Sequence, residues 1–387
     1  MDFTVPEEVV DVCDAIKAFI DREVRPLEEE HRGELVAEGI TPHLYEVAKD
    51  VMAKSVAAGF YGLGMPTDIG GGGLGELGMC FVRETVAGAG AFLSLLMMGD
   101  LPFGPNRMLY ELGTDYQRDK YLMPLMSGDK TTCIALTEPD AGSDLSGVRT
   151  RAVPTDGGWV LNGQKLFITN APYCDFAQVF AATEGGHTIL LVDKDTPGFV
   201  VGPIQRSMGD DHLQSEVYFD DCLVPDENVV GEAGRAFVYA AKFLSNERIA
   251  ISSTAIGMAD WLVAAMVDQA RTRFQFGNPI GHNQAIQWMV ADSKTELYAA
   301  RSMCYDTAWH ADQGDNVMEQ VAMTKLYATE MVGRVADRAV QVFGGMGYMR
   351  DCPVERFYRL ARVLRIAGGT SEVQRMMVAR MAGLGGS

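Results

Sequence analysis

The feature that most constrains the fold is a long apolar run without proline. Residues 235–274 contain no proline and one interior glycine, Gly257. Apolar side chains recur there at helical spacing, which predicts a single helix of unusual length. Such a helix buries its apolar face only if other helices pack along it. We therefore expect a helical bundle in the C-terminal part of the chain.

Three zones of different texture divide the chain. Residues 1–130 have helical periodicity, and residues 234–387 return to it, with further helical patterns at about 283–313, 316–343 and 370–382. Between them lie six short β-prone runs separated by glycine pairs and Asn-Gly turns, at residues 150–153, 159–162, 178–182, 188–192, 199–203 and 216–220.

This order predicts an α+β protein with several domains. We expect an N-terminal helical domain over residues 1–130 and a middle antiparallel β-barrel or sandwich over residues 131–233. A C-terminal four-helix bundle is expected over residues 234–387.

Charge and composition limit the partners. The chain has 387 residues, 47% of them hydrophobic, and a formal net charge of −19. A chain with this acidic excess lacks the basic footprint that nucleic acids and anionic membranes attract, so we expect neither partner. The first residues show no basic region with an apolar core, and we expect no secretion signal and no membrane span.

The cysteines and histidines are dispersed. No Cys-x-x-Cys pair and no His-Glu-x-x-His spacing occurs, so we predict that no metal is bound. An odd number of scattered cysteines favours reduced thiols in the cytoplasm. The seven cysteines are Cys13, Cys80, Cys133, Cys174, Cys222, Cys304 and Cys352.

Residues 137–144 form the most informative short segment. Directly after the apolar residues 133–136, they combine two hydroxyls, three carboxylates, a proline and a glycine. The order predicts a buried strand that ends in a loop with exposed backbone donors. Such a loop suits a ligand rich in acceptors, such as a phosphate or the edge of a flavin ring, although an ordinary surface turn has the same composition.

Five motifs in sequence order resemble those of the acyl-CoA dehydrogenase family. They are residues 135–144, 162–170, 273–280, 341–348 and 368–372, and the resemblance covers nearly the whole chain. Each motif is weak alone, but five in the expected order are specific. The resemblance implies FAD as cofactor, an acyl-CoA substrate, an electron-transfer flavoprotein as acceptor, and a homotetramer or homodimer.

The resemblance also implies a set of FAD contacts. Thr137 would lie near the ring edge and Ser143 near the pyrophosphate, while Phe167 takes a position where relatives often have tryptophan. Arg273, Gln284 and residues 341–345 would reach the FAD of a neighbouring subunit. The full set is Ile134, Leu136, Thr137, Gly142, Ser143, Phe167, Ile168, Thr169, Arg273, Gln275, Phe276, Gln284, Gln341, Val342, Gly344, Gly345, Thr370 and Glu372.

The catalytic base requires a separate argument. Many family members carry a glutamate just before the Gly-Thr of the last motif, where this chain has Gly368. A branch that includes isovaleryl-CoA and long-chain dehydrogenases instead places it on the long bundle helix, immediately before an arginine. Glu247, followed by Arg248, matches that position. The expected base is therefore Glu247, with the Gly368 backbone N–H as a donor to the substrate carbonyl.

Substrate contacts follow from the same resemblance. Arg248 matches an arginine that contacts CoA, and Ser245 stands where relatives have an aspartate. Arg380 matches a further position near CoA. The expected substrate contacts are Ser143, Ser245, Arg248, Gly369 and Arg380.

Two other functions remain open from sequence. The first is a flavoenzyme of the same fold acting on another substrate, such as a nitroalkane or an aryl-CoA. The second is a non-catalytic binding homologue, including a DNA-binding relative. The net charge and the presence of Glu247 disfavour the second.

Overall fold

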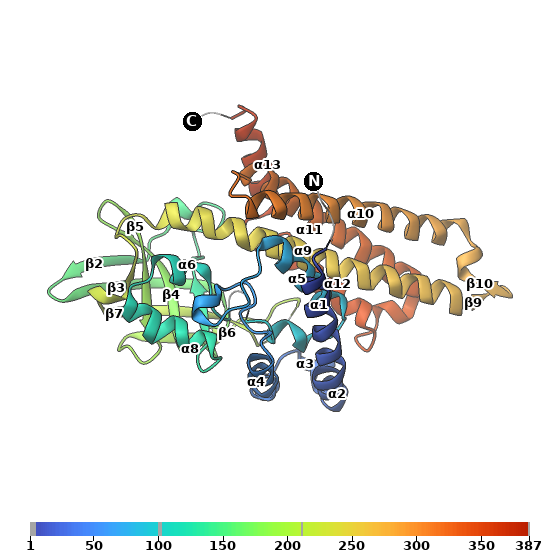
Figure 1. Ribbon diagram of the computed structural model, residues 1–387, viewed down its shortest axis with the longest axis horizontal. Coiled ribbons are helices and arrows are strands. Elements are labelled where there is room, and N and C mark those ends of the chain that lie inside the picture. The colour runs from blue at the N-terminus through green and yellow to red at the C-terminus, as the bar shows by residue number, and fades with distance from the viewer. Residues whose placement is uncertain (1–4, 100–102, 210–211, 386–387) are drawn as a thin grey trace. The chain divides into compact units, whose positions relative to one another are not determined.

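The computed structural model describes residues 5–99, 103–209 and 212–385 (Figure 1). The chain divides into two compact units, each assembled from separate stretches of sequence. A helical unit contains Met1–Ala37, Leu74–Leu95 and Ser245–Ser387, and a sheet unit contains Glu38–Gly73 and Leu96–Leu244.

Long helices dominate the helical unit. They are α1 (Glu7–Phe19), α2 (Arg25–Glu30), α3 (Arg32–Glu38), α5 (Glu76–Gly88), α9 (Ala236–Thr272), α10 (Gln284–Asp312), α11 (Met318–Phe343), α12 (Pro353–Leu364) and α13 (Ser371–Met381), with a short hairpin of β9 (Phe274–Gln275) and β10 (Asn278–Pro279). Helix α9 begins in the sheet unit and continues into the helical unit. The predicted helices at 235–274, 283–313, 316–343 and 370–382 are confirmed to within about two residues at each end.

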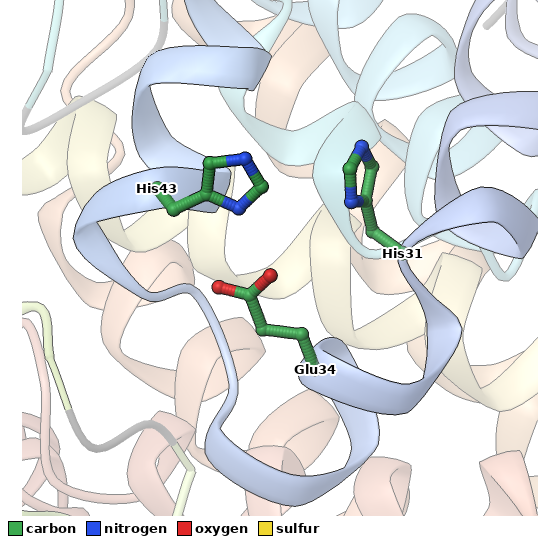
Figure 2. Close-up of side chains that lie close together, drawn as sticks. All are labelled: His31, Glu34 and His43. Atoms are coloured by element: carbon green, nitrogen blue, oxygen red, sulfur yellow. The ribbon is translucent and has the colours of Figure 1, made fainter.

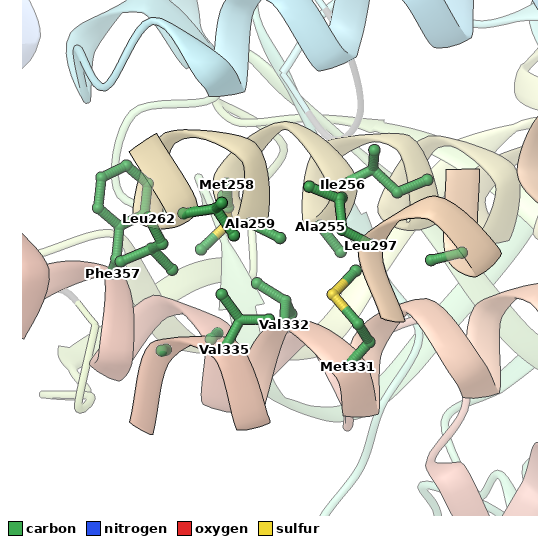
Figure 3. Close-up of a cluster of buried hydrophobic side chains, with 14 of the residues drawn as sticks. Ala255, Ile256, Met258, Ala259, Leu262, Leu297, Met331, Val332, Val335 and Phe357 are labelled. Atoms are coloured by element: carbon green, nitrogen blue, oxygen red, sulfur yellow. The ribbon is translucent and has the colours of Figure 1, made fainter. Parts of the chain in front are cut away.

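The core of the helical unit forms around α9 (Figure 3). Ala255, Ala259 and Leu262 recur every three or four residues, so they share one face of the helix. That face packs against α10, α11 and α12, and each fully buried large apolar side chain stabilises the bundle by about 1.5–3 kcal/mol. Helix α12, which the sequence analysis missed, contributes Phe357 to this core.

Helix α9 also bears on the expectation that no membrane span exists. It is long and apolar enough to cross a membrane by length and composition. In its most apolar window, 61% of the residues are buried inside the protein, as in the core helix of a water-soluble protein. Helix α9 thus differs from the expectation only in its length and hydropathy, and the absence of a membrane span stays a prediction.

Apart from the start of α9, the described residues of the sheet unit form four α-helices and the eight strands of one sheet. The helices are α4 (Pro42–Ala57), α6 (Arg107–Leu112), α7 (Asp115–Gln117) and α8 (Met123–Met126). The strands are β1 (Thr132–Ala135), β2 (Arg151–Thr155), β3 (Gly158–Thr169), β4 (Phe176–Thr183), β5 (Gly186–Asp193), β6 (Phe199–Ile204), β7 (Gln214–Pro225) and β8 (Val229–Val230).

The strand order is β6-β7-β3-β2-β4-β5-β8, and β1 pairs with β4. Most neighbours are antiparallel, as expected, but β1–β4 and β2–β4 are parallel. The tight turns before β3 and β5 place Gly157 and Gly185 at positive φ, which glycine adopts without steric cost. The structure thus confirms a helical N-terminal region, a middle β-sheet region and a helical C-terminal region.

Candidate active site

The predicted base lies in the N-terminal third of α9, just inside the helical unit. Glu247 is partly buried, and neighbouring Arg248 is buried. Burial raises the pKa of Glu247, while the positive charges of Arg248 and Lys325 act in the opposite direction. Among the described residues, no hydrogen bond occupies the Glu247 carboxylate. The group is therefore a carboxylate with a raised pKa and free oxygens, as a general base requires.

The predicted substrate loop joins α12 to α13 and contains two consecutive glycines. Gly368 has φ +64° and Gly369 has φ +92°, a left-handed conformation that favours glycine. In the described part of the chain, the Gly368 N–H donates to no acceptor. This loop therefore presents an unused backbone donor, as predicted for the contact with a substrate carbonyl.

Gly368 and Glu247 lie next to each other. A Cβ added at Gly368 would lie 3.9 Å from Cδ of Glu247 and 2.8 Å from Cδ1 of Ile251. A side chain at position 368 would therefore have to displace the Ile251 side chain and would begin in contact with the Glu247 carboxylate. The sequence pairs a glycine at position 368, where many relatives have the catalytic glutamate, with an acid at position 247. The structure brings these two positions into contact.

Three side chains bind the carbonyl groups of this loop. Nε of Arg248 donates to O of Gly368 at 2.9 Å, and Nζ of Lys325 donates to O of Gly369 at 2.7 Å. Nε2 of Gln374 donates to both carbonyls, at 3.2 and 2.9 Å. The backbone of the loop is therefore fixed by donors from α9, α11 and α13.

The sequence analysis missed Lys325 and Gln374. Lys325 is fully buried, and desolvation together with the charge of Arg248 lowers its pKa to about 8. Its position carried a signal, because Val321, Ala328 and Val332 place it on the buried face of α11. A lysine at an apolar position requires a partner, and Gly369 is that partner.

The 137–144 loop in the sheet unit, which is predicted to contact flavin, is held by an ion pair. The side chains of Lys165 and Glu138 are buried, with Nζ and Oε1 at 2.8 Å. Glu138 also accepts bonds from the backbone N–H groups of Arg149 (2.6 Å) and Thr150 (2.9 Å), and Lys165 donates to O of Leu136 (2.9 Å).

These contacts shift the pKa values of Glu138 and Lys165. Burial acts to raise the pKa of Glu138, but the hydrogen bonds from Lys165 and Thr150 outweigh it, and the pKa is lowered. Burial lowers the pKa of Lys165 to about 8. Of the three carboxylates in residues 137–144, Glu138 therefore has a structural role.

Phe167 adopts a strained backbone beside this loop. Its φ is +60°, and it sits where the β3–β7 register shifts between Lys165 and Ile168. The Phe167 N–H donates to Oε1 of Gln205 at 2.9 Å, and the Leu166 N–H donates to O of Thr137 at 2.8 Å. The bulge leaves the aromatic side chain 61% exposed, next to the 137–144 loop.

The other predicted flavin residues of the sheet unit differ in exposure. Gly142 and Ser143 are exposed, whereas Ile134, Leu136, Thr137 and Thr169 are partly buried. The Ile168 side chain is 2% exposed and packs in the core of the sheet unit. From Ile168, only the backbone is left to meet a ligand.

The remaining predicted residues occupy separate parts of the helical unit. Arg273, Gln275, Phe276 and Gln284 are exposed around the β9–β10 hairpin, and Gln341, Gly344 and Gly345 are exposed at the end of α11. Val342 is buried in the bundle core. Thr370 caps α13 by accepting from the Val373 N–H at 3.3 Å, Glu372 lies in the first turn, and Arg380 is exposed in the last turn.

Two predicted CoA contacts lie in α9. Arg248 has its Nε engaged with Gly368, and burial lowers the pKa of its guanidinium. Ser245 is partly buried one turn before it. Their contact with CoA remains a prediction.

Two histidines and one glutamate, His31, His43 and Glu34, lie in or at the end of the N-terminal helices. His31 ends α2 and Glu34 lies in α3, both in the helical unit. Figure 2 draws them together with His43, which lies in α4 of the sheet unit. Because the three residues belong to different units, we assign no metal ligand set to them, and the absence of a metal remains a prediction.

Comparison with known families covers nearly the whole chain. Residues 6–129, 133–222 and 234–383 match the N-terminal, middle and C-terminal domains of acyl-CoA dehydrogenase, respectively. The chain therefore belongs to the acyl-CoA dehydrogenase family, whose members are flavoprotein oxidoreductases.

Characterised relatives include both dehydrogenases and reductases. The chain is 34% identical to an acyl-CoA dehydrogenase of Bacillus subtilis (strain 168), covering 99% of this chain and 100% of the relative. It is 35% identical to the caffeyl-CoA reductase-Etf complex subunit CarC of Acetobacterium woodii, covering 87% of this chain and 90% of the relative.

Solved structures show the same fold. Butyryl-CoA dehydrogenase from Megasphaera elsdenii superposes with a TM-score of 0.88 at 31% identity, covering 99% of this chain and 100% of that chain. The FAD complex of PigA superposes with a TM-score of 0.89 at 28% identity, covering all of both chains.

The cofactor of this family is FAD, and the residues present fit it. An exposed aromatic ring on a strained bulge offers a flat apolar surface for a ring system. The adjacent loop offers small hydroxyl and glycine residues, and a Cβ at Gly142 would meet only Cγ2 of Thr137, at 4.0 Å. This open, polar rim suits the acceptor-rich edge of a flavin.

Proposed function

We propose that this protein is an FAD-dependent acyl-CoA dehydrogenase in which Glu247 removes the proton from the carbon next to the thioester carbonyl. The observation that carries the proposal is the proximity of Glu247 and Gly368, with a free carboxylate and an unused backbone N–H at one place. FAD, when bound, accepts the hydride from the neighbouring β-carbon.

The residues of this chain supply the acid–base part of the reaction. A thioester α-proton is weakly acidic, so its removal needs both a base and stabilisation of the oxygen on which negative charge develops. Burial raises the pKa of Glu247 and makes it a stronger base than an exposed carboxylate. The positive charges of Arg248 and Lys325 act against that rise and favour the ionised carboxylate.

The Gly368 N–H is the proposed donor to the thioester oxygen. Its direction is set by the backbone on both sides, because the Ala367 N–H is bonded to O of Val363 at 3.0 Å and the Gly368 carbonyl is held by Arg248 and Gln374. A preorganised donor of this kind acts on the charge that forms in the transition state.

The partners and the location of the protein are part of the same proposal. Similarity to a subunit of a reductase–Etf complex supports an electron-transfer flavoprotein as the electron acceptor. Exposed aromatic residues at the β9–β10 hairpin and on α10, including fully exposed Phe276, support a homodimer or homotetramer in which Arg273 and Gln284 reach the neighbour's FAD. All seven cysteines are unpaired and buried, which supports a cytoplasmic location.

Similarity to a reductase supports the reverse reaction, reduction of an unsaturated acyl-CoA, as a second candidate function. Because CarC is a caffeyl-CoA reductase, the same site is proposed to serve reduction of an unsaturated acyl-CoA if electrons arrive from the acceptor side. Glu247 would then return a proton to the α-carbon, since the forward and reverse reactions use the same groups.

The substitution Glu247→Gln tests the proposal. We expect kcat to fall about 10²- to 10⁴-fold with FAD retained, because the amide keeps the shape and loses the base. The measurement is acyl-CoA-dependent bleaching of the flavin absorbance under anaerobic conditions. Asp268→Asn, an exposed acid on the same helix, is the matched control and should keep the wild-type rate. A Glu247→Gln protein that turns over at a near-normal rate would refute the assignment.

A further inference from the structure

The Gly368–Gly369 loop needs external support. Both glycines have positive φ and neither has a side chain to pack, so nothing within the loop itself restricts it to one conformation. The upstream side is tied to α12 through the Ala367 N–H. On the downstream side the Ser371 N–H donates to O of Arg365 at 3.1 Å, and between these two anchors the carbonyls of Gly368 and Gly369 are bound by side chains.

Lys325 is the most deeply buried of these donors. Its side chain emerges from the apolar face of α11, between Val321 and Ala328, and is fully shielded from solvent. A methionine would fill this place without the cost of burying an ammonium group. The bond to O of Gly369 at 2.7 Å is the one hydrogen bond that the described residues give its Nζ. The geometry therefore ties a costly buried charge to the glycine loop.

Glu247 is the negative charge that faces Lys325 from α9. No carboxylate of the described residues forms a salt bridge with Lys325, although Glu247 and, from α13, Glu372 act on it at longer range. Arg248 on α9 is the second cation near Glu247. Lys325 thus contacts the loop directly and the base only through space.

We propose that Lys325 is a positioning residue for α-proton removal: its ammonium holds the Gly369 carbonyl, so that the Gly368 N–H keeps its direction, and it places a positive charge beside Glu247. This inference rests on the proposed function. Gln374, which binds the same two carbonyls, completes the support from α13.

Two substitutions separate the two parts of this role. Lys325→Met removes the hydrogen bond and the charge, whereas Lys325→Gln keeps a donor and removes the charge alone. For Lys325→Met we expect kcat to fall about 10- to 100-fold with KM changed less than about threefold, because the donor of the loop is misplaced in the transition state. Lys325→Gln should recover much of kcat at high pH.

The pH profile reports the charge. In both variants the acid limb of kcat should move to higher pH, because the cation that lowers the pKa of Glu247 is gone. Exposed Lys294→Met, on α10, is the matched control and should change neither kcat nor the limb.

The readout is independent of hydride transfer. Exchange of the α-proton of a bound acyl-CoA with deuterium oxide, followed by NMR, reports proton removal alone, and flavin absorbance reports cofactor content. If Lys325→Met does not fold, Lys325→Gln and Gln374→Leu decide, and the latter should slow exchange without moving the acid limb.

The inference would be overturned if the folded Lys325 variants exchanged the α-proton at the wild-type rate and kept the acid limb of their kcat–pH profile at the wild-type pH. The proposed function fails separately, since only a fully active Glu247→Gln protein refutes that.

Discussion

Lys165 in the sheet unit and Lys325 in the helical unit are both fully buried, and each holds a functional loop by a bond to a backbone carbonyl. Burial is the largest cause that lowers the pKa of each to about 8. They differ in their carboxylates. Glu138 bonds Lys165 directly at 2.8 Å, whereas Glu247 forms no salt bridge with Lys325.

The two carboxylates therefore differ in role: Glu138 supports a loop, and Glu247 is the proposed base. The oxygens of Glu138 are used by Lys165 and by two backbone N–H groups, so this carboxylate is fully engaged in holding the flavin loop. The oxygens of Glu247 accept no hydrogen bond from the described residues, so in the proposed reaction they are left for the substrate proton. A carboxylate that is fully bonded stabilises the protein, and one that is left unbonded near buried cations is available to react.

The largest effect is expected from breaking the bonded pair. Lys165→Met leaves Glu138 buried without its cation, which should lower the free energy of unfolding by about 3–5 kcal/mol and reduce FAD content. The measurement is urea unfolding, with exposed Lys194→Met as control.

The double variant Lys165→Met/Glu138→Gln should recover part of the loss, because no charge remains buried. Lys325→Met should lower the free energy of unfolding less than Lys165→Met does, because Arg248 remains near Glu247. An equal loss in the two variants would contradict the distinction between the two lysines.

An intermediate effect is expected from pH. Glu247 must be deprotonated to act, and its pKa lies above the ordinary value of 4.5. The rate should therefore rise with pH and level off above that raised pKa, falling about tenfold for each unit below it.

Glu138 has a lowered pKa, so its stabilising contribution is present above its unfolded pKa and is lost only as pH falls through the lower folded value. A kcat/KM profile from pH 4 to 8 checks the sign for Glu247, and an unfolding profile extended down to about pH 2 checks the sign for Glu138. A rate limb at or below pH 4.5 would contradict the assignment of a desolvated base.

The smallest effect is expected at Phe167. Phe167→Ala removes the ring and keeps the strain of a side chain at φ +60°, whereas Phe167→Gly removes both. The apoprotein should be more stable as the glycine variant than as the alanine variant by about 0.5–1 kcal/mol.

Both Phe167 variants should bind FAD more weakly than the wild type by about 0.5–1.5 kcal/mol, because the aromatic surface is lost. Titration of the apoprotein with FAD and its chemical unfolding separate the two effects. Equal FAD affinity in all three proteins would remove Phe167 from the flavin site.

Local patterns accounted for much of the fold. Helix α9 was predicted to within two residues because its apolar spacing is continuous, and the β2–β3 and β4–β5 hairpins were found from Gly157-Gly158 and Gly185-Gly186. The turn expected at Asn162-Gly163 was wrong, because β3 continues through these residues. Helix α12 was missed although its pattern is amphipathic: four of its twelve residues are Arg or Glu, and Val354, Phe357 and Ala361 recur at helical spacing on its buried side. The signal for this helix was therefore present in the sequence.

The sequence predicted which positions form the candidate site, but it did not predict the hydrogen bonds that hold them. The proximity of Glu247 and Gly368 was anticipated because a vacant site and an acid occur together in the sequence. The roles of Lys325 and Gln374 were not, because a lysine in an amphipathic helix is usually solvated and its partner lies 44 residues away. Ile168 and Val342 fell within the right motifs, but their side chains face cores rather than the surface.

The crowding at position 368 restricts which residues the position can hold. Any side chain there needs a left-handed backbone and a displaced Ile251. An acid introduced at position 368 would meet both costs before it could replace Glu247, so the glycine loop favours a base that is carried by α9.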